Sequence, residues 1–193
     1  MILTATSGDE DAVVQTLTLA FSADPAVRWT WPDPTQFLEH FPRFVRAFGG
    51  HAFRRGSAYR VDGNEGAALW LPPGVQPDDE AIDAVLSSCL SSQRLKEVMS
   101  VMEQMGGYHP GGDHWYLPLI GVDPFYQGRG HGAALMKDVL RQCDEAGHLA
   151  YLESTNPRNI GLYERHGFVV LGRIQQGDSP TIVPMLRQPR NTG

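Results

Sequence analysis

Apolar and polar positions change their period several times along the first half of the chain, which predicts strands alternating with helices. Over residues 35–48 the phenylalanines stand four, three and four positions apart, so we expect a helix with one apolar stripe. Another helix is expected over 7–21, where Ser7 can cap an acidic first turn. Short strands are expected over residues 2–6, 57–61 and 67–71.

The segment between these two helices breaks the pattern. Asp24 and Pro25 end the first helix, and Trp29 and Trp31 then lie between prolines. Tryptophans flanked by prolines predict an ordered aromatic loop rather than a regular element.

The second half predicts a long helical stretch and then a strand, a helix and a strand. Helical periodicity covers residues 78–105, with a break expected at 87–88 or 91–92. The later expected elements are a strand over 114–122, a helix over 129–146, a strand over 149–153, a short helix after Asn156, and a hairpin of 168–174 with 181–186. Together the two halves indicate an α/β fold of the α+β type, in one domain over residues 1–193.

Composition and charge exclude several classes of protein. The chain is 41% hydrophobic and 20% charged, as expected of a folded globular protein. Its net charge of −6 argues against a nucleic-acid binder, which would need a basic face. Cys89 and Cys143 have no metal or redox spacing, so we expect no metal and two reduced cysteines near the core. Residues 1–10 do not resemble a signal peptide and no apolar run is long enough for a membrane span, so we expect no membrane contact and a cytoplasmic location.

A glycine-rich segment from Gln127 to Ala133 lies between the predicted strand 114–122 and the predicted helix that follows it. Glycines leave the backbone accessible, and N–H groups at a helix start lack intrahelical partners and lie at the positive end of the helix dipole. The segment therefore predicts a phosphate-binding loop. The expected donors are the N–H groups of Gly128, Arg129, Gly130, His131, Gly132 and Ala133.

Three alternative interpretations of this loop differ in the ligand that it would bind. A nucleoside-triphosphate loop requires a Gly-Lys-Ser/Thr ending, which this chain lacks. A dinucleotide-binding fold requires Gly-x-Gly-x-x-Gly early in the unit, whereas the spacing here is Gly-x-Gly-x-Gly and comes late. A tight turn that binds nothing stays open on the loop alone.

Two blocks resemble the GNAT acetyltransferase superfamily. The first, Gln127-x-x-Gly130-x-Gly132, is similar to the acetyl-coenzyme A pyrophosphate loop of that family, Gln/Arg-x-x-Gly-x-Gly/Ala. The second, from Asn156 to Phe168, is similar to the family segment Asn-x-x-Ala/Gly-x-x-x-Tyr-x-x-x-Gly-Phe. The resemblance covers residues 114–170. Shorter runs, 67–73, 119–124, 151–154, 157–159 and 163–165, are also similar to the puromycin N-acetyltransferase branch.

The resemblance implies a fold and an acyl donor. The expected fold is a central mixed, mostly antiparallel sheet of about six to seven strands, splayed at the strand that ends in Gly121-Val122, with helices on both faces. The expected donor is acetyl-coenzyme A. Its pantetheine arm would bond to the backbone of Ile120 and Val122 beside a bulge at Gly121, and to the side chain of Asn159. Arg129 is a candidate for a further phosphate contact.

The resemblance also implies direct acetyl transfer to an amine in a ternary complex. Tyr163 matches the family's general acid, which protonates the departing thiolate. The N–H of Val122 is a candidate oxyanion donor. An alkylammonium with a pKa of about 10.4 must lose a proton before it can attack. Glu153 is the expected base, with His114 and Tyr116 as alternatives.

The acceptor is expected to be a small-molecule amine. Candidate pocket residues are Trp29, Trp31, Trp70 and Tyr116, and residues 78–112 would partly cover the pocket. Alternatives are a protein or peptide amine, either an N-terminus or a lysine, and a non-catalytic acyl-coenzyme A binding or sensing domain. A monomer or a homodimer is expected, with the final hairpin as a candidate contact.

Overall fold

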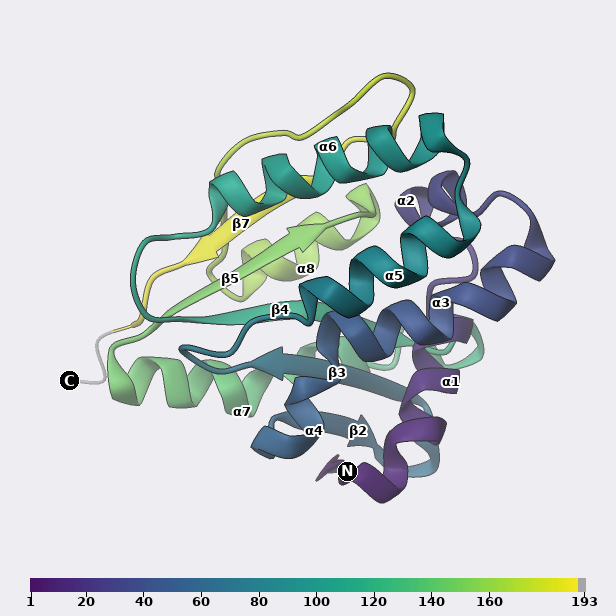
Figure 1. Ribbon diagram of the computed structural model, residues 1–193. Coiled ribbons are helices and arrows are strands. Elements are labelled where there is room, and N and C mark those ends of the chain that lie inside the picture. The colour runs from purple at the N-terminus through teal and green to yellow at the C-terminus, as the bar shows by residue number, and fades with distance from the viewer. Residues whose placement is uncertain (191–193) are drawn as a thin grey trace.

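One mixed sheet organises residues 1–190, which are the residues that the computed structural model describes (Figure 1). The sheet has seven strands in the order β1-β2-β3-β4-β5-β7-β6. The strands are β1 Ile2–Thr4, β2 Ala58–Val61, β3 Gly66–Leu71, β4 His114–Val122, β5 Leu149–Ser154, β6 Val169–Val170 and β7 Val183–Arg187. Every neighbouring pair is antiparallel except β4 and β5. The predicted mixed, mostly antiparallel sheet is therefore confirmed.

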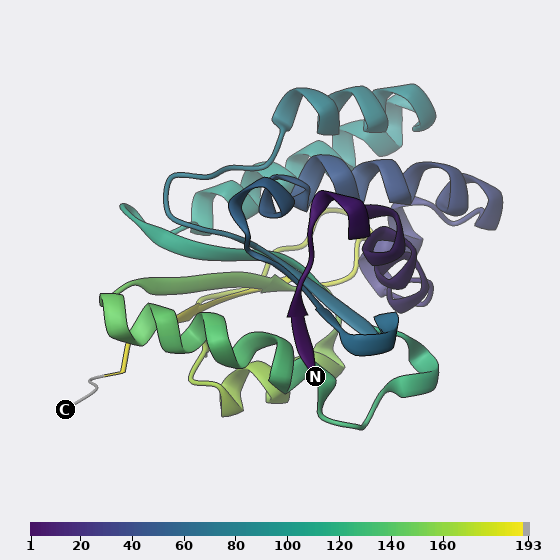
Figure 2. The same ribbon diagram turned by 90° about the horizontal axis from the view of Figure 1, so that it is seen from below.

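Helices cover both faces of the sheet (Figure 2). Two of them, α7 His131–Ala146 and α8 Ile160–Arg165, pack on one face. The opposite face carries α1 Glu10–Ala20, α2 Pro25–Thr30, α3 Pro34–Gly49, α4 His51–Arg55, α5 Asp79–Cys89 and α6 Ser92–Tyr108. None of the helices in residues 1–190 is both long and apolar enough to cross a membrane.

Each face of the sheet has its own hydrophobic core. On the α3 face, Phe37, Phe41, Phe44 and Phe48 form the predicted stripe, with successive rings stacked at centroid distances of 5.1 to 6.2 Å. All six positions of β3 are buried, because helices pack on both of its faces. Because β3 is buried on both faces, its sequence has no alternation of polar and apolar residues that would assign each residue to one face.

The sheet opens between β4 and β5, as predicted. Their parallel pairing runs only from His114 and Leu149 to Tyr116 and Tyr151. The pairing of β4 with β3 shifts register between Leu119 and Tyr116, so the extra residue of the bulge lies around Pro118.

The predicted bulge at Gly121 is therefore wrong. Gly121 pairs regularly with Ala67 on β3. A Cβ at position 121 would lie 2.5 Å from the Cβ of Ala20 and 3.3 Å from a methyl group of Leu17. Glycine is required here because α1 packs directly on the β4 backbone.

Locally, one prediction changes, one helix was not predicted and one predicted break is confirmed. The expected aromatic loop contains α2, because Asp24 caps its first turn and Pro25 occupies the first helical position. Helix α4 was not predicted, since Gly49 and Gly50 conceal the periodicity. The break expected at 91–92 is confirmed, with Ser91 as the N-cap of α6.

Candidate active site

The glycine loop enters α7 through two residues in the left-handed region. Gly128 has φ 77° and Gly130 has φ 82°, values that favour glycine. Gly130 is the N-cap of α7 and supplies no capping side chain. Among the described residues, the N–H groups from Gly128 to Ala133 find no hydrogen-bond acceptor. The loop therefore presents a set of unpaired N–H groups suited to an anion.

Side-chain contacts hold this loop against the end of β4. The Gln127 side chain donates to the Val122 carbonyl at 3.2 Å. The Arg129 guanidinium lies 4.9 Å from the centre of the Tyr126 ring. His131 Nε2 lies 2.9 Å from a carboxylate oxygen of Glu65. These contacts fix the loop beside the open edge of the strand.

The open edge of β4 forms one bank of the split. Beyond Tyr116 the edge that faces β5 has no strand partner within residues 1–190, and Ile120, Gly121 and Val122 lie on this stretch. Free backbone donors and acceptors on such an edge can pair with an extended chain of amides.

Helix α8 carries the predicted residues of the opposite bank. Asn159 is exposed at the N-cap of α8, and Tyr163 lies one turn later on the same helix. Tyr163 is only 5% exposed. Burial, followed by the negative charge of nearby Asp24, raises the pKa of the Tyr163 hydroxyl above its usual range. The phenol therefore keeps its proton at neutral pH.

Asp24 is a buried carboxylate that the sequence reasoning did not single out. Its Oδ1 accepts hydrogen bonds from the N–H groups of Ala26 and Val27, and its Oδ2 accepts one from the Thr155 hydroxyl at 2.6 Å. Burial raises the pKa of Asp24 despite these three bonds. No cationic side chain of the described residues forms an ion pair with it.

A largely apolar cavity of about 100 Å³ lies on the α3 face of the split. Both banks contribute to it, with Pro118 and Leu119 from β4 and Thr155 from the end of β5. Helices α5 and α6 also line it, as expected for residues 78–112. The aromatic wall residues are Phe21, Trp29, Trp31, Phe41, Phe44 and Phe48.

The four predicted pocket residues lie in three places. Trp29 and Trp31 line the cavity. Trp70 is wholly buried on the other face, in the core beneath α7, with its ring 6.4 Å from that of Trp115. Tyr116 is buried beside Phe48 and lies off the cavity wall. The expectation that Trp70 reaches the pocket is therefore wrong, since double burial of β3 hid the face it occupies.

Glu153 lies in a separate buried cluster next to the cavity. Its side chain is 2% exposed, and Oε1 is 3.3 Å from His109 Nε2. His109 Nδ1 is 3.2 Å from His114 Nε2, and His114 Nδ1 is 2.9 Å from the Gly112 carbonyl. A line of polar contacts thus runs from the buried carboxylate to the loop before β4.

Two tyrosines enclose the same carboxylate. Burial first, and then the negative charge of Glu153, raise the pKa of both Tyr116 and Tyr151. Tyr116 therefore stays protonated near neutral pH and is a poor base. The alternatives for the base that remain on this face are Glu153 itself and the histidines.

Two further residues near the cavity, His109 and Thr155, were missed in the sequence analysis for different reasons. His109 lies in a loop without periodicity and gave no signal. Thr155 reaches Asp24 from 131 positions away in the chain, a pairing that no local pattern encodes. Asp24 did carry a signal, the N-cap followed by proline, but this pattern indicates a helix start and says nothing about a site.

The described residues contain no group of three His, Cys, Asp or Glu side chains placed to hold a metal ion. The arrangement that they do contain is a loop of unpaired N–H groups and an open strand edge, next to an apolar cavity with a buried carboxylate behind its wall. A phosphate-bearing thioester and an amine could be brought together there.

Comparisons with known proteins relate the chain to acetyltransferases. Residues 94–168 match the model of the acetyltransferase (GNAT) family. The chain is 30% identical over 152 residues to an uncharacterized N-acetyltransferase of Schizosaccharomyces pombe, an alignment over 70% of this chain. That alignment spans 61% of the relative's own length.

Solved structures share the fold over nearly the whole chain. A histone acetyltransferase HPA2 and related acetyltransferase from Corynebacterium glutamicum is 26% identical, with a TM-score of 0.67 and coverage of 98% of this chain and 96% of that chain. A polyamine N-acetyltransferase of Drosophila melanogaster is 13% identical, with a TM-score of 0.68 and coverage of 97% and 99%. The family match and the shared fold support assignment of the chain to the GNAT acetyltransferase superfamily.

Proposed function

We propose that this protein transfers an acetyl group from acetyl-coenzyme A to the amine of a small-molecule acceptor, within a ternary complex. One observation carries the proposal. The split between β4 and β5 has the unpaired N–H groups of the glycine loop at its end and the apolar cavity on its α3 face. The two substrates would meet where the split opens.

The acyl donor would lie along the open edge of β4. The N–H groups from Gly128 to Ala133 would hold its pyrophosphate, and the backbone of Ile120 and Val122 would pair with the amides of its arm. Asn159 would bond to the arm from the other bank, and Arg129 could reach a phosphate. The groups are complementary: the free N–H donors would bind the pyrophosphate anion, and the free strand edge would pair with the amides of the arm.

The reaction forms a C–N bond and breaks a C–S bond. The neutral amine attacks the thioester carbonyl, whose oxygen would be stabilised by the N–H of Val122. The thiolate then leaves and takes a proton from Tyr163. The Tyr163 hydroxyl is protonated at neutral pH before the reaction, and its raised pKa makes it a weaker acid than an exposed phenol.

The proton lost by the amine has two candidate acceptors. Glu153 is the predicted base, but it lies behind the wall, so a water molecule or His109 would have to connect it to the amine. Asp24 is linked to the wall directly through the Thr155 hydroxyl. Substituting each carboxylate by its amide and recording kcat against pH separates them, because only loss of the true base removes the acidic limb of the profile.

The cover over the cavity favours a small acceptor over a protein. Helices α5 and α6 contribute wall residues such as Leu86 and Met102, and this wall leaves little room for a folded partner. A peptide amine is the second candidate acceptor, because the Corynebacterium glutamicum structure, at 26% identity, is described as a histone acetyltransferase and related acetyltransferase.

Other expectations stay predictions. These are a single domain over residues 1–193, a cytoplasmic location, a monomer or homodimer, and a relationship to the puromycin N-acetyltransferase branch. A non-catalytic acyl-coenzyme A sensor is the alternative of another class.

Release of free thiol from acetyl-coenzyme A, measured across a panel of amines, tests the proposal. Amine-dependent release is expected. A protein that binds acetyl-coenzyme A in calorimetry but releases no thiol with any amine would instead be a binding or sensing domain.

A further inference from the structure

Among the hydroxyls that line the cavity within residues 1–190, only that of Thr155 donates to a carboxylate. The polar side chains on its wall are Thr30, Thr155 and Ser179. The Thr30 hydroxyl donates to the Ala26 carbonyl of its own helix, and the Ser179 oxygen accepts the Gln176 N–H. The Thr155 hydroxyl donates to Asp24 Oδ2, so its oxygen keeps lone pairs that can accept a hydrogen bond from a ligand in the cavity that Thr155 lines.

The carboxylate behind Thr155 lacks a countercharge. Asp24 is 5% exposed and accepts hydrogen bonds from two backbone N–H groups and Thr155. These donors are neutral, and no Lys, Arg or His within residues 1–190 pairs with it. A buried negative charge of this kind is stabilised by a cation that arrives with the ligand.

We propose that the acceptor is an apolar, preferably aromatic, monoamine, whose ammonium binds at the Thr155 hydroxyl in front of Asp24. This inference rests on the proposed acetyl transfer and narrows its acceptor. One N–H of the ammonium donates to Thr155 Oγ1, which in turn donates to Asp24 Oδ2. The body of the amine then lies against the edges and faces of Trp29, Trp31, Phe41 and Phe44, a surface that favours an aromatic ring.

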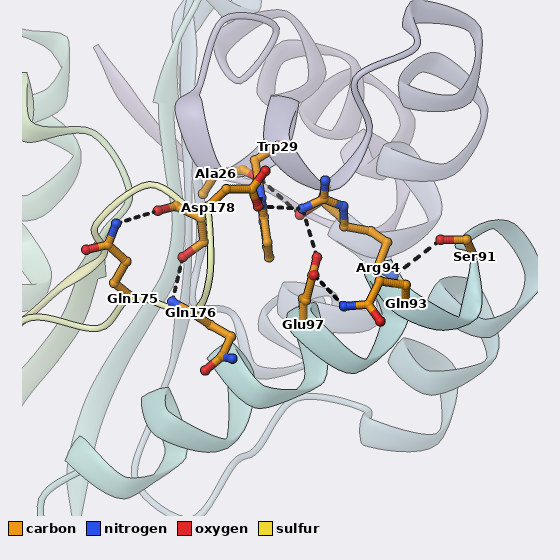
Figure 3. A network of polar contacts seen from close by, with 11 residues as sticks. Ala26, Trp29, Ser91, Gln93, Arg94, Glu97, Gln175, Gln176 and Asp178 are labelled. Carbon is orange, nitrogen blue, oxygen red and sulfur yellow. Dashed lines mark hydrogen bonds and ion pairs between the residues drawn. The ribbon is translucent and has the colours of Figure 1, made fainter.

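A polar cluster next to the wall residue Trp29 bears on whether the acceptor amine can carry a second charge. Asp178 accepts the Trp29 indole N–H at 2.8 Å and lies 3.4 Å from Arg94, which stacks 4.5 Å above the Trp29 ring (Figure 3). Arg94 also pairs with Glu97 at 3.2 Å.

This cluster of Trp29, Arg94, Glu97 and Asp178 carries a net charge of −1, but its carboxylates lie outside the wall. Asp178 is bound to Trp29 and Arg94, and Glu97 to Arg94 and Gln93. A second ammonium inside the cavity would meet no second carboxylate on the wall, which besides Thr155 is aromatic and aliphatic apart from the hydroxyls of Thr30 and Ser179, and burying an unpaired charge is strongly unfavourable. Diamines should therefore be poorer acceptors than monoamines of the same length.

A matched pair of acceptors tests the charge requirement. Hexylamine and 1,6-diaminohexane differ by one terminal amine, and 2-phenylethylamine adds a ring. In the thiol-release assay we expect kcat/KM to be highest for 2-phenylethylamine, and about tenfold or more higher for hexylamine than for the diamine. A diamine or a lysine peptide that equals or exceeds the monoamines would overturn this inference and leave acetyl transfer standing. Absence of release with every amine would instead reject acetyl transfer.

Variants test the position of the ammonium. Asp24→Asn removes the charge but keeps an oxygen for the α2 cap, and we expect KM for 2-phenylethylamine to rise about tenfold or more with KM for acetyl-coenzyme A unchanged. Asp33 caps α3 in the same Asp-Pro context and is exposed, so Asp33→Asn is the matched control. Thr155→Val should raise the amine KM as Asp24→Asn does, and Thr155→Ser should restore it. An amine KM that stays unchanged in both Asp24→Asn and Thr155→Val would place the ammonium elsewhere.

Discussion

His109 Nε2 lies 3.3 Å from Glu153 Oε1 and joins the loop after α6 to the middle of the sheet. The Gly112 carbonyl can only accept, so His114 Nδ1 carries a proton. The contacts of Gly112 with His114, of His114 with His109 and of His109 with Glu153 therefore form one line from the loop to the buried carboxylate. The last contact is a close approach of 3.3 Å rather than a formed hydrogen bond.

Replacing His109 with phenylalanine should destabilise the protein. The ring would fit beside Tyr116 and Tyr151, but Glu153 would lose the group that compensates its burial, at a cost of about 1 to 3 kcal/mol. Urea denaturation measures this loss. His51→Phe removes a half-buried imidazole that contacts the Gln76 carbonyl at the surface, and should change the free energy of unfolding by less than about 0.5 kcal/mol. Equal effects of the two substitutions would mean that Glu153 does not depend on His109.

Tyr163→Phe should slow acetyl transfer by about a factor of 10² or more, because the departing thiolate loses its proton donor. The affinity for acetyl-coenzyme A should change little. Stopped-flow thiol release and calorimetry give the two quantities separately. Tyr59→Phe, on β2, serves as the control. Unchanged turnover in Tyr163→Phe would remove this residue from the chemistry.

Asp24 and Asp144 should respond to pH with opposite signs. Burial raises the pKa of Asp24 above its value in the unfolded chain, so the native state loses stability as pH rises through that raised pKa. The hydrogen bond from Arg187 lowers the pKa of Asp144, so its contribution is present above about pH 4 and is lost as pH falls through the lowered pKa.

It follows that Asp24→Asn should raise the Tm at pH 7 and Asp144→Asn should lower it. Thermal unfolding followed by circular dichroism measures both. A lower Tm for Asp24→Asn would show that the charge of Asp24 is compensated in the native state.

Gly121→Ala should destabilise the fold by about 1 to 3 kcal/mol, because its Cβ would lie 2.5 Å from that of Ala20. Gly106 provides the control, since a Cβ at that position of α6 meets no atom within 4 Å. Gly106→Ala should stabilise the protein by about 0.5 to 1 kcal/mol through helix propensity. Denaturant titration of both variants checks the contrast. Similar values would mean that α1 can move away from β4.

The two left-handed glycines that flank α7 should separate stability from binding. Gly130→Val, at φ 82°, should abolish acetyl-coenzyme A binding by distorting the N–H array. Gly147→Val, at φ 70° at the other end of the helix, should cost comparable stability and leave binding intact. Calorimetric titration measures the affinity of each. Retained binding in Gly130→Val would remove this loop from the donor site.

The sequence predicted the parts of the site that are local in the chain. The glycine loop, the strand before it and the positions of Asn159 and Tyr163 on one helix depend on spacings of a few residues. The boundaries of β4 were predicted as the structure has them, because turn residues flank an apolar run.

Other parts of the site and fold depend on contacts between residues that lie far apart in the chain, which no local sequence spacing reveals. Asp24 acquires its environment from Thr155 and from α2, which two prolines disguised as a loop. Trp70 was assigned to the pocket because a strand buried on both faces gives no alternation from which to choose a side. The requirement for glycine at position 121 comes from Ala20 on a helix about 100 residues earlier, and a bulge was the nearest local explanation.

Identification of the reaction product is the most direct test of acetyl transfer. The purified protein would be incubated with acetyl-coenzyme A that carries a labelled acetyl group and with 2-phenylethylamine, and the products separated by mass spectrometry. We predict labelled N-acetylated amine and free coenzyme A in equal amounts, with formation slowed in Tyr163→Phe. Free coenzyme A accompanied by labelled acetate and no acetylated amine would contradict the account.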